Sequence, residues 1–180
     1  MKYISILAIP LFLASCNLTT KFETVTIDGH YQMDVPDYMT SSTELNDEAS
    51  LQYENSIKET YVIVINEEKQ MLIDLFTEIG SWDESITPLE NYVAIQTESM
   101  ESSLNILNKK GPNDKKVNGM PVMVYEYDGY APGISYEIYY YMAYIEGEDE
   151  LFMVSAWCLG EDKDTYKDTF VKMIESFKEI

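Results

Sequence analysis

The sequence contains no arginine, a single histidine and only two cysteines. Without arginine it has no guanidinium group for bidentate capture of phosphate or carboxylate, which argues against phosphoryl-transfer and nucleotide chemistry. All twelve basic residues are lysines, and 32 acidic residues outnumber them, so the formal net charge is −20. Because nucleic-acid binders need a basic footprint, the charge excludes nucleic acid as a partner class.

The sequence also lacks an apolar run long enough to remain in a membrane. Residues 4–14 are apolar apart from Ser5 and Pro10, and Lys2 is the one charge before them. A membrane-spanning helix needs about 20 apolar residues. A basic start followed by a shorter apolar run is typical of a secretory signal peptide.

The end of this run, Leu13-Ala14-Ser15-Cys16, resembles the bacterial lipobox of lipoprotein precursors. The resemblance implies a diacylglyceryl group on the sulfur of Cys16 and cleavage just before it. Residues 1–15 would then be the lipoprotein signal peptide and residues 16–22 a lipid-anchored tether. Two or more acyl chains give stable anchoring. The alternative is an ordinary secretory signal with a chance cysteine.

The residues after the cysteine bear on location within the cell envelope. Asn17 is not the aspartate that suggests inner-membrane retention in Gram-negative bacteria, and no acidic surface-export cluster follows it. We therefore expect the periplasmic face of the outer membrane in a Gram-negative bacterium. In a single-membrane bacterium we expect the cell surface.

Residues 23–180 are enough for one domain with a sizeable core. Asp28-Gly29 lies between two alternating runs and predicts a hairpin that ends at Pro36. Thr87, Pro88 and Glu90 form the pattern of a capping box with proline at the first helical position. The predicted strands are 50–55, 60–66, 120–130 (preceded by Asn118-Gly119), 134–145 and 151–160, and the predicted helices are 67–80, 87–108 and 162–180. Residues 108–116 are predicted to be a polar loop.

Strands segregated from helices in this way indicate an α+β fold with an antiparallel sheet of about six strands and helices packed on it. The pattern is similar to the PsbP-like fold family. The similarity lies in "YQMDVPDYM", "TPLENYV", "VNGMPVMVYEY", "YEIYYYMAYI" and "FVKMIESFK". It implies an αβα sandwich and binding, accessory or assembly roles rather than catalysis, and it implies no particular ligand.

Tyrosine is the most unusual component, with fifteen in the chain. In a strand, Tyr136, Tyr140 and Tyr144 would point to one face and Tyr139 and Tyr141 to the other. One set must pack under helices. An exposed second set would offer an aromatic surface to a protein or a glycan, so Tyr136, Tyr140 and Tyr144 are the candidate interaction face. The alternative, which we favour, is that both faces are covered.

Few residues suggest chemistry. His30 lies beside a hairpin turn, and no serine has a Gly-x-Ser-x-Gly surrounding, so we expect a solvated histidine and no catalysis. If Cys16 is acylated, Cys158 cannot form an intrachain disulfide, and its alternation with Phe152, Val154 and Ala156 predicts a buried, inert thiol.

Two acidic clusters are candidates for calcium binding: Asp162, Asp164 and Asp168, and Glu146, Glu148, Asp149 and Glu150. An EF-hand needs glycine where Lys167 stands, so we favour solvated acids at a helix N-terminus. We expect no metal and no cofactor.

The sequence as a whole favours a lipid-anchored, non-catalytic binding or accessory protein of the cell envelope, with an envelope protein as its partner. The alternatives are a calcium-dependent adhesion module and a hydrolase. A hydrolase would need a carboxylate pair converging in a cleft with shifted pKa values.

Overall fold

The computed structural model describes residues 20–180. The signal peptide expected over residues 1–15 and the lipidation expected at Cys16 lie outside the described residues and stay predictions. Among the described helices, none has the length and apolar character needed to cross a bilayer.

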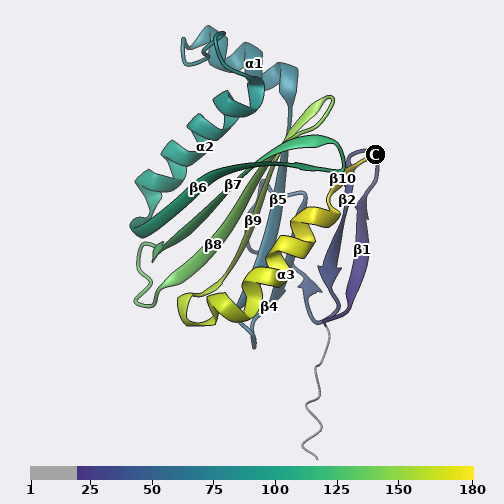
Figure 1. The fold of residues 1–180 in the computed structure, drawn as a ribbon, viewed down its shortest axis with the longest axis vertical. Helices are drawn as coiled ribbons and strands as arrows, with labels where there is room; N and C mark the ends of the chain where they lie inside the picture. Colours follow the sequence, from purple (N-terminus) through teal and green to yellow (C-terminus); the bar gives the residue numbers. More distant parts are fainter. Residues whose placement is uncertain (1–19) are drawn as a thin grey trace, which may run out of the picture.

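Two antiparallel sheets form the framework (Figure 1). The larger has seven strands in the order β3-β4-β5-β9-β8-β7-β6, and the smaller has three in the order β1-β2-β10. Together with three α-helices they confirm the α+β class. The strands are β1 (Phe22–Ile27), β2 (Tyr31–Pro36), β3 (Thr40–Ser41), β4 (Leu51–Asn55), β5 (Thr60–Glu68), β6 (Asn105–Val117), β7 (Met120–Tyr130), β8 (Ile138–Glu146), β9 (Glu150–Leu159) and β10 (Lys178–Glu179).

Helices cover both faces of the seven-stranded sheet. Helices α1 (Lys69–Glu78) and α2 (Pro88–Ser103) lie on one side, and α3 (Lys163–Ser176) lies on the other beside the small sheet (Figure 1). Alternating residues of the central strands supply the two cores. Val62, Ala143 and Ala156 pack toward α3, whereas Met142 and Tyr144 pack toward α2.

The predicted hairpin at Asp28-Gly29 is confirmed. Ile27 pairs with Tyr31, and Gly29 has φ of 80° in the three-residue loop between them. A second tight turn joins β6 to β7, where Asn118 (φ 49°) and Gly119 (φ 93°) both adopt the left-handed conformation. Positive φ at both central residues is the requirement of a type I′ turn, which Asn-Gly meets better than most pairs.

The predicted start of α2 is confirmed. The Thr87 side chain accepts from the Glu90 backbone N–H at 3.2 Å, and the Thr87 N–H donates to the Glu90 carboxylate at 2.7 Å. Its predicted end was wrong, because the helix ends at Ser103 rather than near residue 108. Residues from Asn105 onward pair with β7 instead.

The predicted loop over residues 108–116 was also wrong, because it is part of the edge strand β6. Its lysines and its proline make it resemble a loop in sequence, and in the structure two register shifts interrupt its pairing with β7. Charged side chains, proline and bulges are also the devices that protect an exposed sheet edge from pairing with other chains. The C-terminal helix is likewise shorter than predicted, because Lys178–Glu179 pairs with β2.

The seven-stranded sheet has two distinct ends. We call the end with the β4–β5 turn (residues 56–59) and the β7–β8 loop (residues 131–137) the entry end, because the described chain begins there (Figure 1). Asp37 N–H donates to the Lys21 carbonyl, and Asn55 donates to the Tyr38 carbonyl, which brings the start of β1 next to the β4–β5 turn. The opposite end, with the β6–β7 and β8–β9 turns, is the far end.

Candidate functional site

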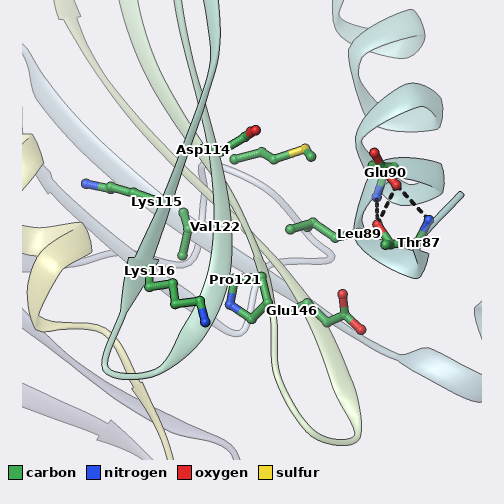
Figure 2. A pocket seen from close by; sticks show the side chains of 10 residues that line it. Thr87, Leu89, Glu90, Asp114, Lys115, Lys116, Pro121, Val122 and Glu146 are labelled. Atoms are coloured by element: carbon green, nitrogen blue, oxygen red, sulfur yellow. Dashed lines mark hydrogen bonds between the residues drawn. The ribbon is translucent and has the colours of Figure 1, made fainter.

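A cleft opens at the far end between the first turn of α2 and the β6–β7 hairpin (Figure 2). We call it the hairpin cleft. Its volume of about 450 Å³ falls within the roughly 300–1,000 Å³ of small-molecule and side-chain pockets. The residues that line it are Thr87, Leu89, Glu90, Asp114, Lys115, Lys116, Pro121, Val122, Met123 and Glu146.

The walls of the cleft are apolar. Leu89 extends from α2 toward the hairpin, and Pro121 faces it from the start of β7 (Figure 2). Val122 and Met123 complete this side. The position of Leu89 follows from the local sequence, since the capping box fixes where α2 begins and Leu89 is its second residue.

The rim of the cleft is charged, and most of its charges already have partners. Lys69 Nζ donates to Glu146 at 3.3 Å and to the Gly147 carbonyl at 2.7 Å, so α1 is tied to the rim. Lys115 lies 3.8 Å from Glu175. Glu90 is held by Thr87, whose backbone and side-chain hydrogen bonds lower the pKa of the Glu90 carboxyl.

Two rim residues remain available. Asp114 and Lys116 are exposed, and within residues 20–180 neither forms an ion pair or a side-chain hydrogen bond. They lie two positions apart on β6, so they share the face of the strand that borders the cleft. An apolar cleft that has the lysine and the aspartate side chains at its rim can hold an apolar group with polar groups on either side of it.

The carboxylates with the most strongly organised surroundings lie on the other face, under α3. Burial alone would raise the pKa of Glu126, but hydrogen bonds from Lys167 and Tyr139 outweigh it and hold the pKa below its ordinary value. Asp128 behaves in the same way, with burial opposed by hydrogen bonds from Lys163 and Asn108. Both carboxyls are therefore ionised partners of lysines, and neither has the raised pKa of a general acid. Glu126 and Asp128 therefore do not form the acid–base pair that a hydrolase would need.

His30 lies in the β1–β2 turn, and its side chain is 45 % exposed. Its Nδ1 lies 2.9 Å from Glu150 Oε1, and Asn66 donates to the same carboxylate oxygen at 2.7 Å. None of the hydrogen bonds of His30 in the described structure involves a serine. The geometry thus fits a surface hydrogen bond between the β1–β2 turn and β9.

The acidic clusters considered for calcium do not converge. Glu146 pairs with Lys69 and Glu150 with His30, while the Glu148 N–H takes Glu179 as its acceptor. Within residues 20–180, no group of three or more histidine, cysteine, aspartate or glutamate side chains could hold a metal ion. Asp162, Asp164 and Asp168 lie around the first turns of α3, where acids are favoured by the helix dipole.

Cys158 is a free, buried thiol in the core on the α3 side, together with the predicted neighbours Phe152, Val154 and Ala156. Burial raises the pKa of its thiol to about 12. The thiolate, which is the reactive form of cysteine, is thereby disfavoured.

The candidate tyrosine face separates into three environments. Tyr136 precedes β8 and is 50 % exposed, Tyr140 is half-buried, and Tyr144 is fully buried against Tyr92, with ring centroids 6.0 Å apart. The alternation of Tyr140 and Tyr144 against Tyr139 and Tyr141 is as expected. Including Tyr144 in an interaction face was wrong, because α2 covers it.

The sequence did not point to the hairpin cleft. Its residues come from four elements, and the sequence pattern predicts a loop rather than a strand at Asp114–Lys116. Asn118-Gly119 was the available signal, because a type I′ turn before a strand requires a second strand on its other side.

Known structures resemble the fold, although the sequence matches no protein-family model and no curated protein. CyanoP, the cyanobacterial PsbP of Synechocystis, aligns with a TM-score of 0.57 at 13 % identity, covering 93 % of this chain and 99 % of that one. LpqN of Mycobacterium tuberculosis, described as involved in cell envelope biogenesis, gives 0.55 at 9 % identity, covering 88 % and 90 %. The Ran-binding protein Mog1p of Saccharomyces cerevisiae gives 0.53 at 13 % identity, covering 89 % and 96 %.

The chain has the PsbP-like fold. The match spans nearly the whole of CyanoP and most of this chain. At these identities the likeness shows the fold alone.

Proposed function

We propose that this protein is a lipid-anchored, non-catalytic binding protein of the bacterial cell envelope. In this proposal Cys16 carries the lipid, residues 16–22 form the tether, and residues 23–180 form the binding domain. The partner is another envelope protein, which inserts an apolar side chain into the hairpin cleft. Lys116 and Asp114 carry opposite charges at the rim. They would orient the polar groups that lie on either side of this apolar side chain in the partner.

The position of the cleft is the observation that carries this proposal. It lies at the far end of the domain, while Lys21 lies at the entry end, where its carbonyl accepts from the Asp37 N–H. A domain tethered through residues just before Lys21 keeps the hairpin cleft away from its own anchor and open to a neighbour. Its apolar walls and partner-free rim residues are the features expected of an anchor pocket in a protein interface.

A site-specific crosslink tests this proposal. Pro121 borders the cleft and is exposed, so we would replace it with the photoreactive residue benzoylphenylalanine. Lys172, exposed on α3, is the matched control position. We expect one envelope protein to be crosslinked from position 121 and not from 172, and the crosslink to disappear in Cys16→Ser, which loses the anchor.

A further variant separates the cleft from the anchor. Met123→Glu places a charge in the apolar wall and should abolish the crosslink from position 121 while the lipidated protein stays in the membrane. Mass spectrometry of the N-terminal peptide reads the acylation of Cys16 directly. Equal crosslinking from positions 121 and 172, or an unmodified Cys16, would contradict the proposal.

A further inference from the structure

Exposed apolar side chains gather at the entry end of the domain. Ile57, at the tip of the β4–β5 turn, is 94 % exposed. Tyr136 and Ile134, in the β7–β8 loop, are 50 % and 36 % exposed. Loop tips usually carry small or polar residues, so these three side chains need an explanation other than packing.

Strand register places these tips together. Thr60 of β5 pairs with Cys158 of β9, and Cys158 pairs with Tyr139 of β8, so the turn before β5 and the loop before β8 project from the same end of the sheet. A pocket of about 170 Å³, whose lining includes Glu59 from the turn and Ile134 and Tyr136 from the loop, joins the two. Ile57 precedes the lining residue Glu59 by two positions in the same turn.

The start of the described chain lies at this same end. Besides the Asn55 contact with Tyr38, Lys58 Nζ sits 5.2 Å from the centroid of the Tyr38 ring. Tyr38 follows Asp37, which binds the Lys21 carbonyl. Lys21 is the fifth residue after Cys16, and even a fully extended chain spans at most roughly 18 Å over these five steps. A lipid on Cys16 would therefore keep the entry end close to the bilayer surface.

We propose that Ile57, Ile134 and Tyr136 insert into the headgroup region of the bilayer that holds the anchor. This inference rests on the proposed lipidation of Cys16. Isoleucine and tyrosine suit that boundary, because an apolar body can enter the acyl region while a tyrosine hydroxyl stays with the headgroups. Acyl chains at Cys16 and apolar loop tips around it together fix the orientation of the domain, whereas a tether alone leaves it free to tumble.

The charged residues at the entry end determine which lipid headgroups this surface can contact. Glu59, Glu137 and Glu161 border the pockets at the entry end, and Lys58 is the cation nearest to Ile57 in the sequence. Acidic groups so close to the surface disfavour anionic headgroups. The surface that fits is a zwitterionic one, such as phosphatidylethanolamine. In this orientation the hairpin cleft and α1 point away from the membrane.

The test uses the full lipidated protein, reconstituted into phosphatidylethanolamine vesicles. Single cysteines replace Ile57, Tyr136 or Ile79, and each carries the environment-sensitive fluorophore NBD. Ile79 is the matched control, because it is an isoleucine 61 % exposed at the end of α1, on the far end. Cys158 is buried, so labelling goes to the introduced cysteine. Lipids with a nitroxide on the upper acyl chain serve as the quencher.

We expect NBD at positions 57 and 136 to be quenched at least about threefold more than NBD at position 79, because only groups at the acyl boundary meet the nitroxide. In an Ile57→Asn/Ile134→Asn background, quenching at position 136 should fall toward the level at 79. Weak quenching at all three positions, or stronger quenching at 79, would overturn the proposal. A Cys16 that takes up NBD is not acylated, and that result would instead contradict the proposed function.

Discussion

Lys167 Nζ lies 2.8 Å from both carboxylate oxygens of Glu126, and the Tyr139 hydroxyl donates to the same carboxylate at 2.8 Å. One turn earlier on α3, Lys163 repeats this arrangement with Asp128 at 2.7 and 2.8 Å. Lysines four positions apart on the helix thus meet carboxylates two positions apart on β7. Because both spacings must match, these pairs fix the rotation and register of α3 on the sheet.

Removing the lysine from one pair should leave a buried carboxylate without its counter-ion. We expect Lys167→Met to lower the free energy of unfolding by about 1–3 kcal/mol. The loss should lie toward the lower end of this range, because the lysine side chain is 37 % exposed and solvent screens its charge. The double variant Lys167→Met/Glu126→Gln should lose less than the sum of the two single variants. Urea unfolding of the four proteins measures the coupling, and strictly additive effects would show that the pair contributes nothing.

The same pairs predict an acid-sensitive fold. The folded-state pKa values of Glu126 and Asp128 lie below their ordinary values near 4, so their contribution to stability is present above that pH. It is lost as the pH falls through the lower, folded-state values. We expect the melting temperature of the wild type to drop more steeply below about pH 4 than that of Glu126→Gln/Asp128→Asn. If the melting temperatures of the two proteins fall equally steeply as the pH decreases, this assignment is refuted.

Cys158 should be inert in the folded protein. With its pKa raised to about 12 and its side chain buried, the thiol is almost wholly protonated at neutral pH and shielded from reagents. We expect iodoacetamide to label it only after unfolding, in step with loss of structure in urea. Rapid labelling under native conditions, measured by mass spectrometry on Cys16→Ser protein, would contradict the core position of Cys158.

The β6–β7 turn should be sensitive to a single methyl group. Gly119 has φ of 93°, which an alanine adopts only under strain, although space for its methyl group is open. We expect Gly119→Ala to cost about 1–2 kcal/mol in the free energy of unfolding, while Lys116→Ala on the same hairpin costs less than about 0.5 kcal/mol. Thermal unfolding compares them. Equal stability of the two variants would mean that the turn does not constrain the hairpin.

The first turn of α2 should depend on Thr87. Its side chain accepts from Glu90 and takes part in the reciprocal capping box. We expect Thr87→Ala to lower the free energy of unfolding by about 1 kcal/mol, and Thr87→Ser to retain most of the wild-type stability. Both are measured by urea unfolding. If the serine variant is as unstable as the alanine variant, the hydroxyl is not the stabilising group.

Local patterns determined much of the fold. Asp28-Gly29 specified a turn because glycine adopts positive φ without strain, and Thr87-Pro88 with Glu90 specified a helix start through hydrogen bonds that need only neighbouring residues. Alternation also placed Cys158 in the core. In each case the interactions that determine the structure lie within a few residues, so the local sequence is enough to predict it.

Tertiary structure alone decided where distant residues meet. Residues 108–116 are polar enough for a loop, yet they form a strand because β7 supplies hydrogen-bond partners for their backbone. Tyr140 and Tyr144 share a face, but the path of α2 leaves one half-buried and covers the other. The hairpin cleft and the apolar entry end arise in the same way, because non-local packing and strand order bring together elements that no local pattern connects.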